Sequence, residues 1–485
     1  MTGETQDMDG ENGSDSLFIL DNEEKLIDLD YIQVLFAGLV GAVAGGTMYL
    51  GAVADVYWIP SGFVFGLLSA LFYGRRAPGP GRGMIWGLGI SFLTGLFLFG
   101  IDHTITTVAF EFADSSDIFS NIVKITLGLG APIGLAIGGI NAVTKETGTE
   151  PIKLDRGIIT GGLAGLIAGL IVQPWLEQYG IVGFTVNGNG LEGLLYHLLF
   201  TTAVGIMYGL LFQRDARGWG SSITWGFAYG FFWWTLGVLT LSPLLTGDPV
   251  LWNLPDGRGL ISSFVGHGLY GLILGFIYSV FDHLWIIMFY ESDPLHISVR
   301  GPGFANVQSL KWGSLSAIPG GIIYVALIWY VGRAEYISRI VGAQSTSVGI
   351  VVAMIIALII GMIYGVLYRY ESPNLGTAVL WGFVYGVIWW YVGILTLLPE
   401  IITGQATWTH QAIDIGMPLL IGQMIYGSLT AAIFYIFEYR EKAWATVDPN
   451  AKATEEIRRR KVGTSAPAVW MYSLGMGVFV LLLLL

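Results

Sequence analysis

One 19-residue stretch occurs twice in the chain and constrains its architecture more than any other feature. Residues 225–243 read WGFAYGFFWWTLGVLTLSP and residues 381–399 read WGFVYGVIWWYVGILTLLP, with 12 of the 19 positions identical. The same offset of 156 residues superposes further glycines and Tyr-Gly pairs without a gap: Gly157 on Gly313, Gly165 on Gly321, and Tyr270-Gly271 on Tyr426-Gly427. Agreement at one spacing over this length predicts an internal duplication.

The segment before residue 146 carries a weaker version of the same pattern. Gly38 and Gly46 match the paired glycines of the later copies, and Trp86 matches Trp225. We therefore expect three tandem four-helix units and a lone terminal helix. The predicted organisation is an acidic disordered tail (1–30), a diverged first unit (31–145), a second unit (151–290), a third unit (308–440), a basic loop (441–467) and a terminal helix (468–485).

The composition places this duplicated chain in a membrane. Hydrophobic residues make up 54% of the 485 residues and charged residues only 12%, about half the charged fraction of soluble domains. Apolar runs of about 20 residues recur, which is the length that spans a bilayer core. We expect an all-α integral membrane protein with about 13 transmembrane helices, at 32–53, 57–74, 83–106, 119–142, 157–175, 191–213, 219–245, 258–281, 312–332, 347–367, 375–400, 413–437 and 468–485. The short segment 284–290 is expected to lie at the membrane interface.

The charges indicate how the helices are oriented. Residues 1–30 hold ten acidic residues against one lysine, and so little apolar surface predicts disorder. With the N-terminus in the cytoplasm, 19 of the 23 basic residues fall in inner loops and tails, as the positive-inside rule requires. The C-terminus would then lie outside. Units with an even number of helices would enter the membrane in the same direction, around either a central path or a sealed, glycine-packed centre.

Several classes of chemistry find no support in the sequence. It contains no cysteine, which removes thiol catalysis, disulfides and iron–sulfur ligation. It also lacks Walker, HExxH and GxSxG motifs, each of which marks a known type of enzyme site. The residues therefore favour a non-enzymatic protein that does not bind nucleic acid and whose evident partner is the lipid bilayer.

Histidines are the sharpest candidates for a binding site. Four of the six fall on the predicted outer side: His103, His197, His267 and His410. His197 and His267 lie at similar depth on two parallel helices of the second unit. Two such imidazoles could bind a b-type haem, and the four histidines could bind a divalent metal with help from Asp102, Glu192 or Asp414. Structural hydrogen bonding to a neighbouring helix is the competing interpretation, and a contact to a substrate path or a quinol is a third.

Aromatic residues midway through two helices form the second candidate set. They occupy equivalent positions in the second and third units: Tyr229, Trp233, Trp234, Tyr385, Trp389 and Trp390. They could fill the space between glycine-lined helices, or line a cavity for an aromatic, quinone-like or cationic ligand. The repeated Tyr-Gly pairs indicate tight helix contacts in which the hydroxyl bonds to the next helix.

One part of the second unit has a family resemblance. Trp225-Gly226 opens its third helix, and Gly266-His267 with Tyr270 follows in its fourth. In these residues the chain resembles the YagU-type inner-membrane proteins, an uncharacterised family with about four helices. The resemblance implies tandem four-helix units in a prokaryotic plasma membrane and carries no biochemical activity. The matching histidine is absent from the first and third units, which have Gly130 and Gln423 in its place.

Three hypotheses for function follow from these features. The first is a membrane protein that conducts or senses a small solute through a path between parallel units. The second is a scaffold or accessory subunit of a larger membrane complex, such as a respiratory one, suggested by the lone last helix and the long basic loop. The third is a redox protein that holds haem b or a metal at His197 and His267.

Overall fold

The chain folds into a bundle of helices. The computed structural model describes residues 31–109, 115–144, 153–181, 191–289, 302–369, 371–445 and 466–485. Within these ranges every regular element is helical, and 12 helices are long and apolar enough to cross a membrane. The prediction of an all-α, multi-pass membrane protein is therefore confirmed.

The helices form three four-helix groups, called here the first, second and third group. The first group contains α2 (Tyr31–Leu50), α3 (Trp58–Tyr73), α4 (Pro80–Ala109) and a fourth helix built from α5 (Ser115–Val123), the π-helical η2 (Lys124–Gly130) and α6 (Ala131–Thr144). The second contains α7 (Leu154–Gln178), α8 (Leu191–Phe212), α9 (Trp219–Trp233) extended by the π-helical η3 (Trp234–Leu241) and α10 (Ser242–Thr246), and α12 (Ile261–Phe289). The third contains α13 (Pro302–Tyr330), α15 (Thr346–Leu367), α16 (Leu375–Trp389) extended by the π-helical η6 (Trp390–Leu397) and α17 (Leu398–Thr403), and α18 (His410–Ala445). Short helices lie in two loops, α11 (Leu254–Gly259) and α14 (Ala334–Ser338).

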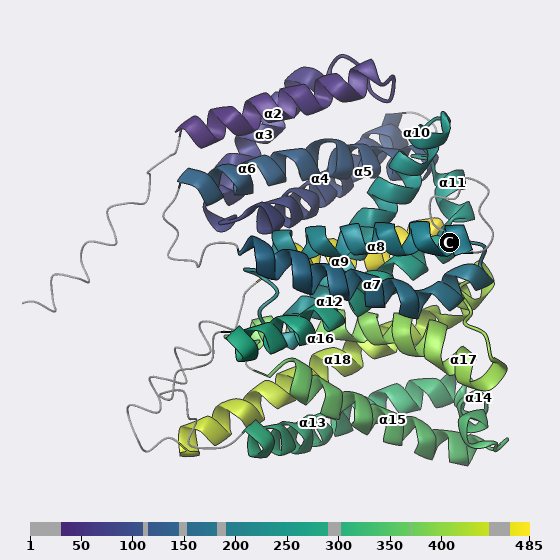
Figure 1. Cartoon of the computed structure of the whole chain (residues 1–485). Helices are drawn as coiled ribbons and strands as arrows, with labels where there is room; N and C mark the ends of the chain where they lie inside the picture. The colour runs from purple at the N-terminus through teal and green to yellow at the C-terminus, as the bar shows by residue number, and fades with distance from the viewer. Residues whose placement is uncertain are drawn as a thin grey trace, which may run out of the picture.

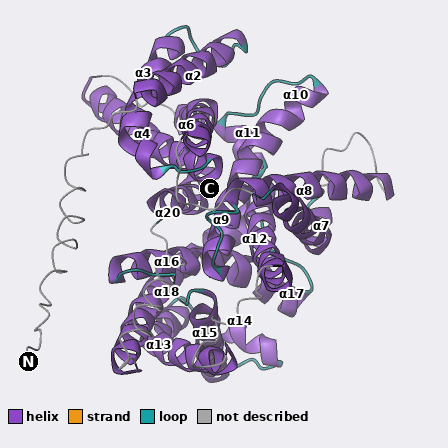
Figure 2. Cartoon of the chain, turned by 60° about the vertical axis from the view of Figure 1, so that its left-hand side comes forward, coloured by secondary structure: helices purple, strands orange, loops and turns teal. Residues whose placement is uncertain are grey.

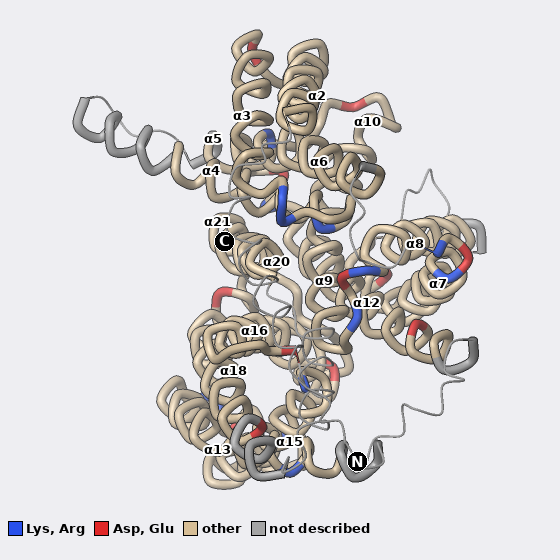
Figure 3. The backbone as a smooth tube through the Cα atoms, turned by 90° about the vertical axis from the view of Figure 1, so that its left-hand side faces the viewer, with Lys and Arg blue, Asp and Glu red and all other residues tan. Residues whose placement is uncertain are grey.

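The three groups lie side by side with their helices roughly parallel to one axis (Figure 1). The second group lies in the middle, because α8 packs against α4 and α9 packs against α16. The views in Figures 2 and 3 show the terminal helix, α20 (Pro467–Leu474) with η7 (Gly475–Val480) and α21 (Leu481–Leu484), between the first and third groups. The groups therefore form an arc, and the terminal helix lies between its two ends.

Close glycine contacts hold the helices of each group together. Gly226 of α9 and Gly271 of α12 face each other so closely that a Cβ on either would overlap the main-chain oxygen of the other. The same reciprocal contact recurs 156 residues later, between Gly382 of α16 and Gly427 of α18. Lipid offers no hydrophobic drive for helix association, so this close main-chain approach supplies the packing contacts that stabilise the crossing.

Tyrosine hydroxyls tie the second helix of a group to the third and fourth. Tyr270 donates to the main-chain oxygen of Thr201 (3.0 Å). Tyr426, at the matching position, donates to the main-chain oxygen of Ala357. These two Tyr-Gly pairs thus bond across helices as expected, whereas the hydroxyl of Tyr73, in the first group, has no hydrogen-bond partner among the described residues.

The terminal helix contacts all three groups through their third helices. The ring of Trp470 packs edge-on against Trp381 of α16, with the ring centroids 5.2 Å apart. Phe479 packs in the same edge-on manner against Phe92 of α4. Within η7, the main-chain oxygen of Gly477 accepts a hydrogen bond of 2.9 Å from Tyr391. The region between the three groups is thus filled with side chains from one additional helix.

Two boundaries differ from the sequence-based expectation. Helix α3 has 16 residues, which span about 24 Å at 1.5 Å per residue, so it is shorter than a full bilayer core. The helix expected at 258–281 is longer, since α12 continues without a break through Phe289, and the interfacial position of segment 284–290 stays a prediction. The polar residues of α12 explain this continuation: Asp282 pairs with Arg156, and His283 donates to the main-chain oxygen of Ser279 (2.8 Å). The predicted acidic tail and most of the basic loop lie outside the described residues.

Candidate functional site

Basic side chains gather at one end of the molecule, where α4, α7, α9 and α20 begin. This end, called here the basic end, holds two cavities lined by Arg76, Arg82, Arg156, Arg214 and Arg217, and it faces the viewer in Figure 3. Because α8 and α12 end where α7 and α9 begin, the helix dipoles largely offset each other. The basic side chains are therefore what favours an anion at this end.

An ion pair joins the first and second groups at the basic end. Arg82, near the start of α4, bonds to the Oδ1 atom of Asp215 at 2.6 Å, and the carboxylate is almost completely buried. Asp215 lies in the loop between α8 and α9. Because a buried charge is stable only when it is paired, this contact fixes how the two groups meet.

The junction between the second and third groups has a carboxylate at the matching position, but that carboxylate has no ion pair among the described residues. Glu371 lies 156 residues after Asp215 and is fully buried. It accepts hydrogen bonds from the main-chain N–H (3.1 Å) and the hydroxyl (3.2 Å) of Ser221, at the start of α9. Burial raises the pKa of Glu371 from its ordinary 4.5 to about 8, and the bonds from Ser221 oppose this rise only in part.

Stability should consequently fall with rising pH. A folded-state pKa above the unfolded value means that the folded protein holds an extra proton between about pH 4.5 and 8. Stability is then highest below this window and is lost as pH rises through it, on the order of 3–5 kcal/mol in total. We expect Glu371→Gln to remove most of this dependence, as read from thermal unfolding midpoints between pH 5 and 9. If the unfolding midpoint of Glu371→Gln changed with pH as steeply as that of the wild type, the pH dependence could not be assigned to Glu371.

A cavity of ≈ 450 Å³, called here the first cavity, lies between the first group, the second group and the start of the terminal helix. Its lining residues are Arg76, Arg82, Trp86, Trp225 and the segment Ala466, Pro467 and Ala468. Trp225 is only 1% exposed, and its indole N–H has no hydrogen-bond partner among the described residues. The guanidinium groups of Arg76 and Arg82, the latter paired with Asp215, and a helix start thus surround one space, which suits an anionic ligand.

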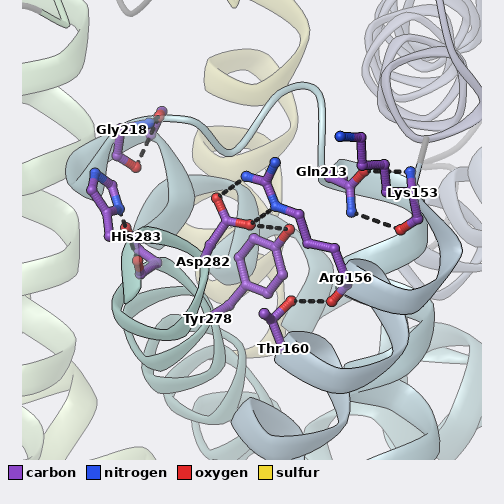
Figure 4. A network of polar contacts seen from close by, with 10 residues as sticks. Lys153, Arg156, Thr160, Gln213, Gly218, Tyr278, Asp282 and His283 are labelled. Carbon is purple, nitrogen blue, oxygen red and sulfur yellow. Dashed lines mark hydrogen bonds and ion pairs between the residues drawn. The ribbon is translucent and has the colours of Figure 1, made fainter. Parts of the chain in front are cut away.

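A second cavity of ≈ 170 Å³ lies at the basic end of the second group. It is lined by Lys153, Arg156, Gln213, Arg214, Arg217, Asp282 and Ile286. Figure 4 shows its polar network, in which Arg156 faces Asp282 and Gln213 faces the main chain of Lys153. The lining of this cavity therefore contains four basic side chains and only one carboxylate.

The structure brings two of the four candidate histidines near each other. His197 is buried and donates from Nε2 to the main-chain oxygen of Gly169 on α7 (3.2 Å). His267 donates from Nδ1 to the main-chain oxygen of Ser263, one turn earlier in its own helix (2.9 Å). The two rings are close enough to interact electrostatically. Each is thus held by a structural hydrogen bond, and a shared haem or metal site stays a prediction.

The other two histidines lie elsewhere. His410 is exposed at the start of α18 and donates from Nε2 to the main-chain oxygen of Arg258 (2.8 Å). The side chains of His103, Asp102 and Glu192 lie outside the described residues. Among the side chains that are described, no three of the His, Asp and Glu type gather as a metal site would require.

The six candidate aromatics lie inside the helix packing. Tyr229 donates to the main-chain oxygen of Val204 (3.1 Å), and Tyr385 makes the matching bond to Ile360 (2.6 Å). The indole N–H of Trp390 donates to Gly416 (2.8 Å). Trp233 and Trp234 are buried, and Trp389 is partly buried. The two cavities described above are lined by other residues, so a ligand beside these six side chains stays a prediction.

The basic residues of the cavities were recognised in the sequence only as markers of membrane orientation. The contacts that make them a site join distant parts of the chain, since Arg82 and Asp215 are 133 residues apart and Arg156 and Asp282 are 126 apart. One signal was available: Asp215 and Glu371 occupy the same position of the duplicated stretch. A carboxylate repeated at the end of a membrane helix indicates a buried polar contact.

Comparison with known proteins adds no relative. No family model, curated protein or solved structure matches the chain. The class of protein therefore rests on its own structure: a multi-pass α-helical membrane protein with two cation-lined cavities at one end. The scaffold and redox hypotheses stay predictions.

Proposed function

We propose that this membrane protein moves or senses a small anionic solute, which it binds in the first cavity. The observation that carries the proposal is the lining of that cavity, in which Arg76, which has no ion pair within the described ranges, lies beside Arg82 and the start of the terminal helix. A guanidinium group binds carboxylates and phosphates through charge-assisted hydrogen bonds. The volume also lies in the range of small-molecule sites.

We propose in addition that the basic end faces the cytoplasm of a prokaryotic cell and that the three groups are copies of one unit. The positive-inside rule supports the orientation, because the basic end holds more of the loop arginines than the opposite end, which has Arg258, Arg333 and Arg339. The recurrence of the Gly226–Gly271 contact 156 residues later supports the duplication. The first cavity would then open to cytoplasmic metabolites.

The test is ligand binding to the detergent-purified protein, followed by flux. Succinate, citrate and glycerol 3-phosphate are added in turn, and the shift in thermal unfolding midpoint gives the affinity of each. We expect at least one of them to stabilise the wild type and Arg76→Gln to weaken its binding about tenfold, because hydrogen bonds between charged groups are lost. Uptake of the labelled anion into proteoliposomes then separates movement from sensing.

The matched control is Arg75→Gln. Arg75 precedes Arg76 in the chain and is also exposed, but it does not line the first cavity. Its glutamine variant should bind the anion as the wild type does. Equal weakening by both substitutions, or no stabilisation by any of the three anions, would contradict the proposal.

A further inference from the structure

The second cavity combines several basic side chains with one carboxylate, Asp282, whose oxygens already accept hydrogen bonds from neighbouring side chains. Arg156 holds Asp282 through two parallel bonds, from Nε to Oδ1 (2.7 Å) and from the terminal nitrogen to Oδ2 (2.6 Å). Tyr278 donates a third, longer bond to Oδ1 (3.4 Å). Because both oxygens of the carboxylate are engaged, an incoming anion meets little repulsion from it.

The main chain at the start of α7, next to the second cavity, is held in place by a side chain of α8. Gln213, at the end of α8, accepts from the main-chain N–H of Lys153 (2.8 Å) and donates to its main-chain oxygen (3.1 Å). This pair of bonds fixes the start of α7 and with it the position of Lys153 at the cavity. Arg217, from the loop before α9, is partly buried and has no ion pair within the described ranges.

Two cations of this cavity, Lys153 and Arg217, are not a requirement of the helix packing, whereas Arg156 pairs with Asp282. At the positions 156 residues later, Lys153 and Arg217 are replaced by Ser309 and Pro373, and the third group folds in the same arrangement. The positive charge of Lys153 and Arg217 therefore calls for another explanation than folding.

The surface beside the cavity is apolar and exposed. Leu154 and Ile158 on α7 and Leu284 on α12 are large, exposed apolar side chains. In the chain, Leu154 and Ile158 come shortly after the cavity residue Lys153, and Leu284 comes shortly before the cavity residue Ile286. In a membrane protein such side chains face acyl chains. We propose that the second cavity binds the phosphate of an anionic lipid headgroup, whose acyl chains lie along α7 and α12. Basic pockets between transmembrane helices suit this chemistry.

The experiment measures lipid binding to the full chain purified in a neutral detergent. Dioleoylphosphatidylglycerol, dioleoylphosphatidylcholine and inorganic phosphate are titrated separately, and bound lipid is counted by native mass spectrometry. We expect the wild type to bind phosphatidylglycerol at least about tenfold more tightly than phosphatidylcholine, since the anionic headgroup keeps its net charge against the cations. The double variant Lys153→Gln, Arg217→Gln should lose most of this preference.

The control removes the same charge from the basic end of the third group, with Lys311→Gln and Arg369→Gln, and should keep the preference. If the first double variant elutes as an aggregate, Arg217→Gln alone takes its place, with a loss of severalfold expected. Arg76→Gln should keep the preference for phosphatidylglycerol, which separates this site from the first cavity. Equal lipid binding by all variants would overturn the proposal, and so would inorganic phosphate that binds as tightly as phosphatidylglycerol.

Discussion

Leucine in place of Gly226 is expected to prevent the protein from folding. The added side chain would meet the main-chain oxygen of Gly271, and a main chain cannot rotate aside as a side chain can. Overpacking a well-filled interior costs about 1–3 kcal/mol even when side chains can adjust, so a clash with the main chain should cost more. Gly382→Leu, at the matching crossing of the third group, should have the same effect. The monodisperse fraction in size-exclusion chromatography measures the outcome.

Gly139 provides the comparison for this prediction. It lies in α6, and a Cβ placed on it has no neighbour within 4 Å. Gly139→Leu should therefore elute as the wild type does. A Gly226→Leu protein that was monodisperse, with an unfolding midpoint close to that of Gly139→Leu, would show that the α9–α12 crossing tolerates separation.

The second large effect is expected from Trp470→Ala in the terminal helix. Trp470 is 4% exposed and packs edge-on against Trp381. Removing a buried aromatic side chain of this size costs about 3–5 kcal/mol. Because the terminal helix lies between α4 and α16, the loss should loosen the contact between the first and third groups. Thermal unfolding in detergent would show a midpoint several degrees below the wild type.

Leu482→Ala, in the same helix, is the control for this effect, since Leu482 is 53% exposed. Its truncation should move the midpoint by about a degree or less, because an exposed side chain gives up little burial. Similar midpoints for the two variants would mean that the terminal helix is held by its main chain and not by Trp470.

The membrane spans could be predicted from the sequence because lipid demands complete, apolar helices. The expected span at 191–213 became Leu191–Phe212, and that at 347–367 became Thr346–Leu367. The extension of α12 to Phe289 was missed because Asp282 and His283 suggested an end. Their partners Arg156 and Ser279 keep these polar groups compatible with a continuing helix. Asp282 is satisfied by a residue 126 positions away, which no local pattern reveals.

The position of the terminal helix within the bundle could not be predicted from the sequence either. Its sequence is apolar on every side, so no periodic pattern indicates which face packs against which neighbour. Only the packed structure shows Tyr391 bonded to Gly477 and Trp470 against Trp381. The first cavity depends on the same packing, since its lining combines Trp86 and Trp225 with the segment that starts at Ala466.

The position of that helix bears on how such a protein can evolve. A closed ring of repeated units fixes their number, because the last unit must meet the first, whereas units in a row contact only their neighbours. Here the second group adjoins both others, and a helix of unrelated sequence lies between α4 and α16. Under the duplication proposed above, the copy number is set by a segment outside the duplicated unit. A gene that gained or lost one copy would need a reshaped final helix before its product could pack.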